Sequence, residues 1–135
     1  KKTKALDFII EELGLSNQIS TFNGRTEDLA SEQPNSFSVI TARALSSLPS
    51  LLELSSPLLE QGGQLLCYKA HPEDEEVTQA ILLEKKLGLK LIDMYEGYLS
   101  DNESHRMIFV FEKIHEAEVS LPRRSGMAQR RPYKA

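Results

Sequence analysis

Three short stretches place charged side chains where predicted strands end. GRTED follows a predicted strand over residues 18–24, TARALSSL follows one over 37–42, and YKA ends one over 64–70. In open α/β sheets, ligands bind at the carboxyl ends of the strands. A carboxylate at such a junction can accept hydrogen bonds from a ligand hydroxyl or amine, and a nearby helix start offers free backbone amides. Glu27 and Arg43 are therefore candidate ligand-binding residues, and Lys69 has the same kind of position.

A structural role for the same residues stays open. Arg25 and Glu27 can be read as loop charges, and Arg43 can pair with a carboxylate at the sheet edge. The remaining carboxylates fall mostly on predicted helix ends and solvent-facing sides. Position alone does not decide between ligand binding and a structural role for these residues.

Several other chemistries lack their signatures. Gly62 and Gly63 run into Gln64, so no GxxxxGK[ST] phosphate loop is present, and no GxSxG nucleophile motif occurs. The three histidines are far apart in sequence and lack metal-ligand spacing. Cys67 is the only cysteine and lies in an apolar run, which indicates a buried small side chain and excludes an internal disulfide. We expect neither a metal site nor nucleophilic catalysis.

The C-terminal residues 121–135 carry a charge opposite to that of the rest of the chain. They contain five cations and no acidic residue, and without those five charges the formal net charge of −4 would be −9. The cations are Arg123, Arg124, Arg130, Arg131 and Lys134. Because proline, glycine and like charges disfavour a packed structure, the plainest interpretation of this segment is a disordered terminus.

The hydrophobic pattern predicts the elements that must position these residues. Helical spacing predicts helices over residues 1–13, 26–30, 48–56 and 72–87. Apolar and β-branched runs predict strands over 18–24, 37–42, 64–70, 89–99 and 105–113, the last two joined by a short polar connection. The strand over 37–42 is apolar enough to be buried on both faces. Alternating helices and strands imply a mostly parallel sheet flanked by helices and ending in an antiparallel hairpin.

Length and composition are those of one soluble domain. The chain has 135 residues and 40% hydrophobic content, with no apolar run near the roughly 20 residues that cross a bilayer. No stretch looks like a signal peptide. We therefore expect a cytoplasmic protein.

An ordered set of motifs resembles one enzyme family. RTEDLA, FSVITARALSSL, SPLLEQGGQLLCYKA, SHRMIFVFEK and LPRRSGMAQRRP are similar, in this order, to the guanine-N7 methyltransferases of small-subunit (16S) ribosomal RNA, also called glucose-inhibited division protein B. Each motif is weak alone, but the ordered set covers essentially the whole chain. The resemblance implies a Rossmann-like class I S-adenosylmethionine-dependent methyltransferase fold.

The resemblance extends only to the C-terminal part of the family's domain. The family's glycine-rich loop and the acidic residue that holds the cofactor ribose would both lie upstream of Lys1. The cofactor contacts carry over onto Thr26, Glu27 and Arg43. Departures from the family pattern are Ser38, Ala70 and Ser125. Ala70 replaces a common glycine and puts a tight turn beside the substrate in doubt.

The resemblance implies methyl transfer from S-adenosylmethionine to N7 of a guanine. That nitrogen carries no proton, so the reaction needs alignment rather than a general base. Lys69 and Arg106 become candidate contacts to RNA phosphate, with solvent-exposed strand-end charges as the alternative. The cations of residues 121–135 suit ribosomal RNA in the same way.

The expected organisation is a domain portion over 1–120 and a basic tail over 121–135. In the family's strand order, two absent strands would separate residues 18–24 from the four later strands. We therefore expect those four strands to form one cluster, with 18–24 not paired to 37–42, and we expect the chain alone to be inactive.

Two other functions stay open. The chain could be an α/β module that binds RNA through its tail without catalysis, or an unrelated nucleotide-binding domain. The resemblance implies rRNA modification in the cytoplasm without metal or membrane, and it leaves the oligomeric state unknown.

Overall fold

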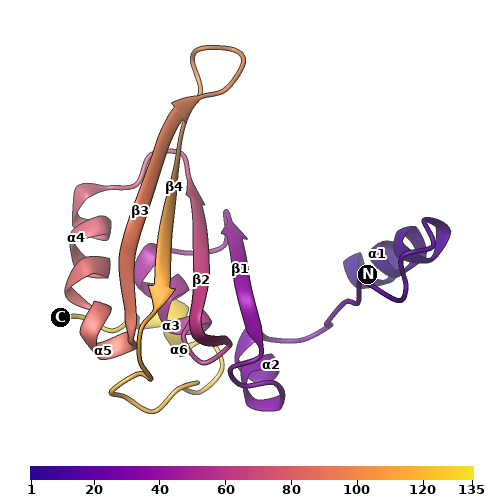
Figure 1. The fold of residues 1–135 in the computed structure, drawn as a ribbon, viewed down its shortest axis with the longest axis horizontal. Helices are drawn as coiled ribbons and strands as arrows, with labels where there is room; N and C mark the ends of the chain where they lie inside the picture. The colour runs from indigo at the N-terminus through magenta and orange to yellow at the C-terminus, as the bar shows by residue number, and fades with distance from the viewer.

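The computed structural model describes all 135 residues and contains one four-stranded sheet (Figure 1). The strands are β1 (Phe37–Arg43), β2 (Leu59–Lys69), β3 (Leu89–Tyr98) and β4 (His105–Lys113), in the order β1-β2-β4-β3. β1 runs parallel to β2, and β4 runs antiparallel to both of its neighbours. Three strands thus share one direction. The predicted cluster of four strands and its closing hairpin are confirmed.

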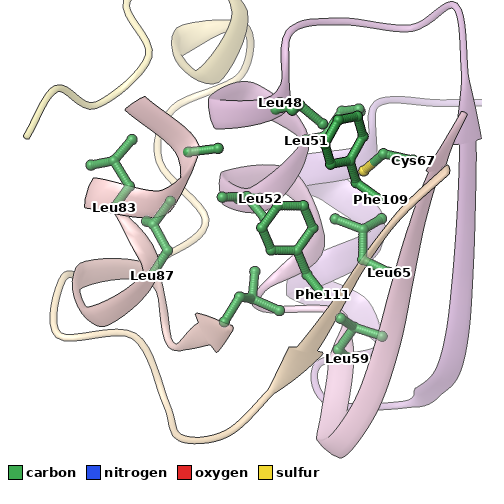
Figure 2. Packing of buried hydrophobic residues seen from close by; sticks show 12 residues of the cluster. Leu48, Leu51, Leu52, Leu59, Leu65, Cys67, Leu83, Leu87, Phe109 and Phe111 are labelled. Atoms are coloured by element: carbon green, nitrogen blue, oxygen red, sulfur yellow. The ribbon is translucent and has the colours of Figure 1, made fainter. Parts of the chain in front are cut away.

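One face of the sheet carries the helices and the core. α3 (Leu48–Ser55) and α5 (Glu84–Leu87) supply buried leucines, α4 (Asp74–Leu82) supplies Ala80, and β4 supplies two phenylalanines. Figure 2 shows the side chains of α3 meeting Phe109 and Phe111 across this interface. Cys67 lies in the same cluster and is fully buried. This core fixes α3 and β2 relative to each other, and both elements border the sites described below.

Local sequence explains where the helices begin and end. Ser47 caps α3 by accepting a hydrogen bond from the Ser50 amide, and Pro49 occupies the first turn. The predicted helix over 72–87 divides at Leu83 into α4 and α5 and excludes Pro72. α5 ends at Gly88, whose φ of 77° suits glycine. A Cβ there would lie 2.1 Å from the His115 carbonyl oxygen, so a side chain cannot be accommodated.

The opposite face of the sheet is open to solvent. Tyr68 and Tyr95 belong to one cross-strand row on this face, and both are exposed. On β1, Val39 is 55% exposed whereas Ile40 packs against the core. The prediction that residues 37–42 are buried on both faces is therefore wrong. Helices cover only one side, so the strand alternates between core and solvent.

The N-terminal residues stand apart from the sheet. α1 (Lys2–Glu12) forms as predicted, but it buries no residue and exposes Leu6, Phe8 and Ile9. Figure 1 shows it joined by an extended connection to α2, which precedes β1. Residues 18–24 form no strand, which corrects that prediction, and they do not pair with β1. A strand needs a hydrogen-bonding partner, and none lies beside this segment.

Candidate functional site

A pocket of about 530 Å³ lies at the carboxyl ends of the parallel strands β1 and β2. We call it the strand-end pocket. It is lined by Arg43, Ala44, Tyr68, Lys69, Ala70, Leu99, Arg106, Met107 and Ile108. Its volume falls within the roughly 300 to 1,000 Å³ of sites for small molecules. Three predicted site residues, Arg43, Lys69 and Arg106, thus meet in one cavity.

The three cations of the strand-end pocket differ in how many hydrogen bonds and ion pairs they make with the protein. The Lys69 ammonium donates to the Ser46 carbonyl oxygen at 2.7 Å and lies 2.8 Å from a carboxylate oxygen of Glu76. The Arg106 guanidinium donates to the His105 carbonyl oxygen at 2.7 Å. Arg43 is exposed and makes no side-chain hydrogen bond or ion pair. The Lys69 charge is thus paired with Glu76, Arg106 uses one guanidinium nitrogen, and Arg43 keeps all of its donors free.

The turn between β3 and β4 borders this pocket through Leu99 and is held by a carboxylate. Asp101 accepts hydrogen bonds from the amides of Glu103 and Ser104 and from the Ser104 hydroxyl. These bonds favour the ionised form, and the Ser104 bonds contribute most. They lower the pKa of Asp101 from 3.8 to about 2.

This turn should therefore resist acid. The pKa of Asp101 is lower in the folded state than in the unfolded state. The stability that ionised Asp101 contributes is therefore complete above about pH 3.8 and is lost as the pH falls through about 2. We expect the Ser104 and Glu103 amide NMR signals to titrate with a midpoint near pH 2. A midpoint near 3.8 would contradict the hydrogen bonding described here, and the Asp101→Asn variant should show no such titration.

A second, smaller pocket of about 180 Å³ lies between α2 (Thr26–Glu32) and the C-terminal segment. We call it the tail-side pocket. Its lining residues are Gly24, Arg25, Thr26, Glu27, Leu45, Leu54 and Gln129. The predicted cofactor residues Thr26 and Glu27 lie here, whereas Arg43 lines the strand-end pocket. Leu45 follows the strand-end residue Ala44 directly, so the two pockets are neighbours along the chain.

The C-terminal segment packs on the domain, which corrects the interpretation of a disordered terminus. Arg123 donates twice to the Glu53 carboxylate, at 2.5 and 2.6 Å, and its guanidinium lies 4.0 Å from the centre of the Tyr133 ring. Glu53 is only 2% exposed. The hydrogen bonds that Arg123 donates to the Glu53 carboxylate raise the pKa of Arg123 above its usual value. Arg123 is thus a structural cation in this arrangement.

The other predicted RNA contacts of this segment face solvent. Arg124, Arg130, Arg131 and Lys134 are all exposed. The short helix α6 (Met127–Arg130) buries Ala128 and ends at Arg130, the first arginine of the second pair. Four of the five tail cations are therefore accessible to a polyanion.

Sequence reasoning missed Glu53 and Gln129. Glu53 interrupts the apolar helix segment LPSLLELS, and a carboxylate on a core-facing helix must find a cation. A segment with five cations and no acid offers the partner, but the two residues are 70 positions apart. No local signal identifies Gln129.

The structure holds no assembled metal or thiol centre. No group of three or more His, Cys, Asp or Glu side chains converges. Burial raises the pKa of the Cys67 thiol to about 12, so it is protonated at neutral pH and a poor nucleophile. None of the helices is both long and apolar enough for a membrane span.

Solved structures share this arrangement of sheet and helices. A structure from Galdieria sulphuraria, described as a candidate sarcosine dimethylglycine methyltransferase, has a TM-score of 0.62 at 11% identity and covers 84% of this chain and 66% of its own. A candidate tRNA (m1A22) methyltransferase of Streptococcus pneumoniae has a TM-score of 0.59 at 15% identity. The match covers 88% of this chain and 51% of that structure's chain. At such identities the likeness shows the fold alone. It is the Rossmann-like α/β fold of methyltransferases.

Sequence comparison gives the family within this fold. The family model described as rRNA small subunit methyltransferase G matches residues 1–100. A ribosomal RNA small subunit methyltransferase G of Carboxydothermus hydrogenoformans is 34% identical over 98% of this chain, and one of Fervidobacterium nodosum is 32% identical over 99%. The chain belongs to the rRNA small subunit methyltransferase G family, as its motifs predicted. It spans 57% and 62% of these two relatives' lengths.

Proposed function

We propose that this chain is the C-terminal part of an S-adenosylmethionine-dependent methyltransferase that modifies N7 of a guanine in small-subunit ribosomal RNA. Residues 1–120 would form part of the catalytic domain, and residues 121–135 a basic tail. The observation that carries the proposal is the strand-end pocket, where Arg43, Lys69 and Arg106 meet at the carboxyl ends of β1 and β2 in a member of this family. Ligands of open α/β sheets bind at this edge.

The tail-side pocket suits one end of the cofactor. Leu45 and Leu54 offer apolar surface to a flat base, while Thr26, Glu27 and Gln129 offer hydrogen-bonding groups. Its 180 Å³ is less than the roughly 300 Å³ of a complete small-molecule site, so it would hold only part of such a ligand. Thr26 and Glu27 would hold the adenine end there, and Arg43 would border the cofactor from the strand-end pocket.

The proposed methyl transfer requires that guanine N7 be aligned with the methyl group of the cofactor. S-adenosylmethionine supplies an electrophilic methyl group when bound. Guanine N7 has a lone pair and carries no proton, so none of the pocket residues needs to act as a base. Lys69 and Arg106 would bind RNA phosphate and orient the base. Such alignment lowers a barrier by about 7 to 11 kcal/mol in favourable cases.

Calorimetry with S-adenosylhomocysteine tests the proposal. We expect binding by the chain extended upstream to the length of its relatives and no measurable binding by the 135 residues alone, which lack a glycine-rich loop. The extended protein should also methylate 16S ribosomal RNA at a guanine N7, and Arg43→Ala should weaken both activities. An extended protein that binds RNA but not S-adenosylhomocysteine would contradict the proposal and favour a non-catalytic RNA-binding module.

The exposed tail cations should bind RNA phosphate. Replacing Arg124, Arg130 and Arg131 together with alanine should flatten the slope of log affinity against log salt by about 2 to 3, since each neutralised phosphate contributes roughly 0.7 to 0.9. S-adenosylhomocysteine affinity should change little, because these side chains line neither pocket. A matched variant that replaces Lys1, Lys2 and Lys4 should keep the slope. An unchanged slope in the tail variant would refute a role of the tail in RNA binding.

A further inference from the structure

The C-terminal segment and the start of α2 are connected by specific polar contacts. The Gly126 amide donates to a carboxylate oxygen of Glu27 at 2.8 Å, and this bond is buried. The Arg25 guanidinium donates to the Gln129 side-chain oxygen at 3.1 Å and lies 3.7 Å from Glu27. Glu27 itself is only 6% exposed. One oxygen of the predicted cofactor residue is therefore engaged by the tail.

The tail also has its own anchors on α3. The Ser50 hydroxyl donates to the Ala128 carbonyl oxygen at 2.7 Å, and Arg123 binds the buried Glu53. Because α3 belongs to the core, these contacts place α6 at a fixed position beside α2. Gln129 then lines the tail-side pocket together with Thr26 and Glu27. A segment 99 residues away from Glu27 in sequence thus supplies one wall of that pocket.

We propose that the docked tail, through Gln129, completes the cofactor-binding pocket, so that tail docking and cofactor binding favour each other. This inference rests on the proposed function, and it assigns Gln129 as a positioning residue. It also gives Glu27 a second role, in which its carboxylate orders the tail that forms the wall.

Coupling of this kind is reciprocal. If docking of the tail raises cofactor affinity by some factor, bound cofactor must favour the docked tail by the same factor. Typical couplings lie at roughly 5- to 150-fold. The tail also carries exposed arginines, after which trypsin cleaves. Proteolysis can therefore follow the docking of the tail without measuring methyl transfer. Trypsin cleavage after Arg130 requires the tail to open, and its rate tracks the population of the open form.

The test uses the protein extended upstream to the length of its relatives. Saturating S-adenosylhomocysteine should slow cleavage after Arg130 by at least fivefold. Gln129→Ala should raise the dissociation constant of S-adenosylhomocysteine by at least fivefold and abolish most of that protection. Gln129→Glu keeps an oxygen acceptor for Arg25 and should restore affinity to within about twofold of the wild type. Ser125→Ala, a change at an exposed position of the same tail that carries no charge, should leave affinity unchanged.

Two outcomes would overturn the inference, and they differ in meaning. If S-adenosylhomocysteine binds but neither slows cleavage nor responds to Gln129→Ala, the coupling is wrong and the proposed function stands. If the wild type binds no S-adenosylhomocysteine, the proposed function fails and the coupling fails with it. In that second case Glu27→Ala should still speed cleavage after Arg130 about tenfold, because the anchoring contact of the tail exists without a ligand.

Discussion

The Lys113→Met variant is expected to lower the free energy of unfolding by about 2 to 4 kcal/mol. The Lys113 side chain is fully buried, and its ammonium donates to three oxygens. These are the Asn35 side-chain oxygen at 2.7 Å, the Ser56 carbonyl at 2.7 Å and the Leu59 carbonyl at 2.9 Å. Methionine fills a similar volume but donates no hydrogen bond, so buried acceptors lose their partner. Urea denaturation followed by circular dichroism measures the difference.

The matched control is Lys90→Met, on the neighbouring strand. Lys90 is exposed and its ammonium makes no hydrogen bond or ion pair, so its loss should change stability by at most about 0.5 kcal/mol. Equal stabilities of the two variants would mean that the three bonds of Lys113 contribute nothing net. The expected difference identifies Lys113 as the junction that ties the end of α3 to the start of β2.

The second large effect is expected at Arg123. Arg123→Ala should lower the free energy of unfolding by about 3 to 5 kcal/mol, because it leaves the buried Glu53 carboxylate without its cation. Arg124→Ala removes the same charge from the next position and should change stability by at most about 0.5 kcal/mol. Thermal and urea unfolding of the two variants gives a direct comparison.

A paired substitution separates the ion pair from simple packing. Replacing Glu53 and Arg123 together with methionine removes both charges and keeps apolar volume. Such exchanges of a buried pair are often neutral or stabilising, by about 1 to 4 kcal/mol. We therefore expect the double variant to be more stable than Arg123→Ala. If the double variant is as unstable as the single one, the contribution of Arg123 lies in its contacts with Tyr133 and the Arg131 carbonyl instead.

Local sequence predicted most of the sheet because its strands carry their own signals. β1, β3 and β4 lie close to the predicted ranges, and the short polar connection before His105 indicated the hairpin. β2 begins five residues before its predicted start and runs through Gly62 and Gly63, although glycine is weakly favoured in strands. Residues 18–24 have strand-like composition but no partner in this chain. The residue composition of a segment indicates its tendency to form a strand. Whether the strand forms depends on a neighbouring strand with which it can pair.

The part of the candidate site that lies at the strand ends could be predicted from the sequence. Arg43, Lys69 and Arg106 converge because the carboxyl ends of β1 and β2 and the beginning of the antiparallel β4 meet at one edge. The docked tail was not predictable from composition, since its cations resemble a solvated terminus. Its packing depends on two buried acids, Glu27 and Glu53, and on the left-handed backbone of Gly126, which caps the start of α6. Contacts over such sequence separations leave no periodic signal.

The separation of α1 from the sheet has a thermodynamic consequence. An isolated helix shorter than about 12 to 15 residues is marginal in water, and α1 has 11 residues with none buried. The first 24 residues can therefore lose their structure without disturbing the core. Their unfolding exposes little additional apolar surface, so they contribute little to the heat-capacity change. In calorimetry the cooperative transition should correspond to residues 25–135, and a heat-capacity change divided by all 135 residues would underestimate the apolar surface that each residue of the sheet domain buries.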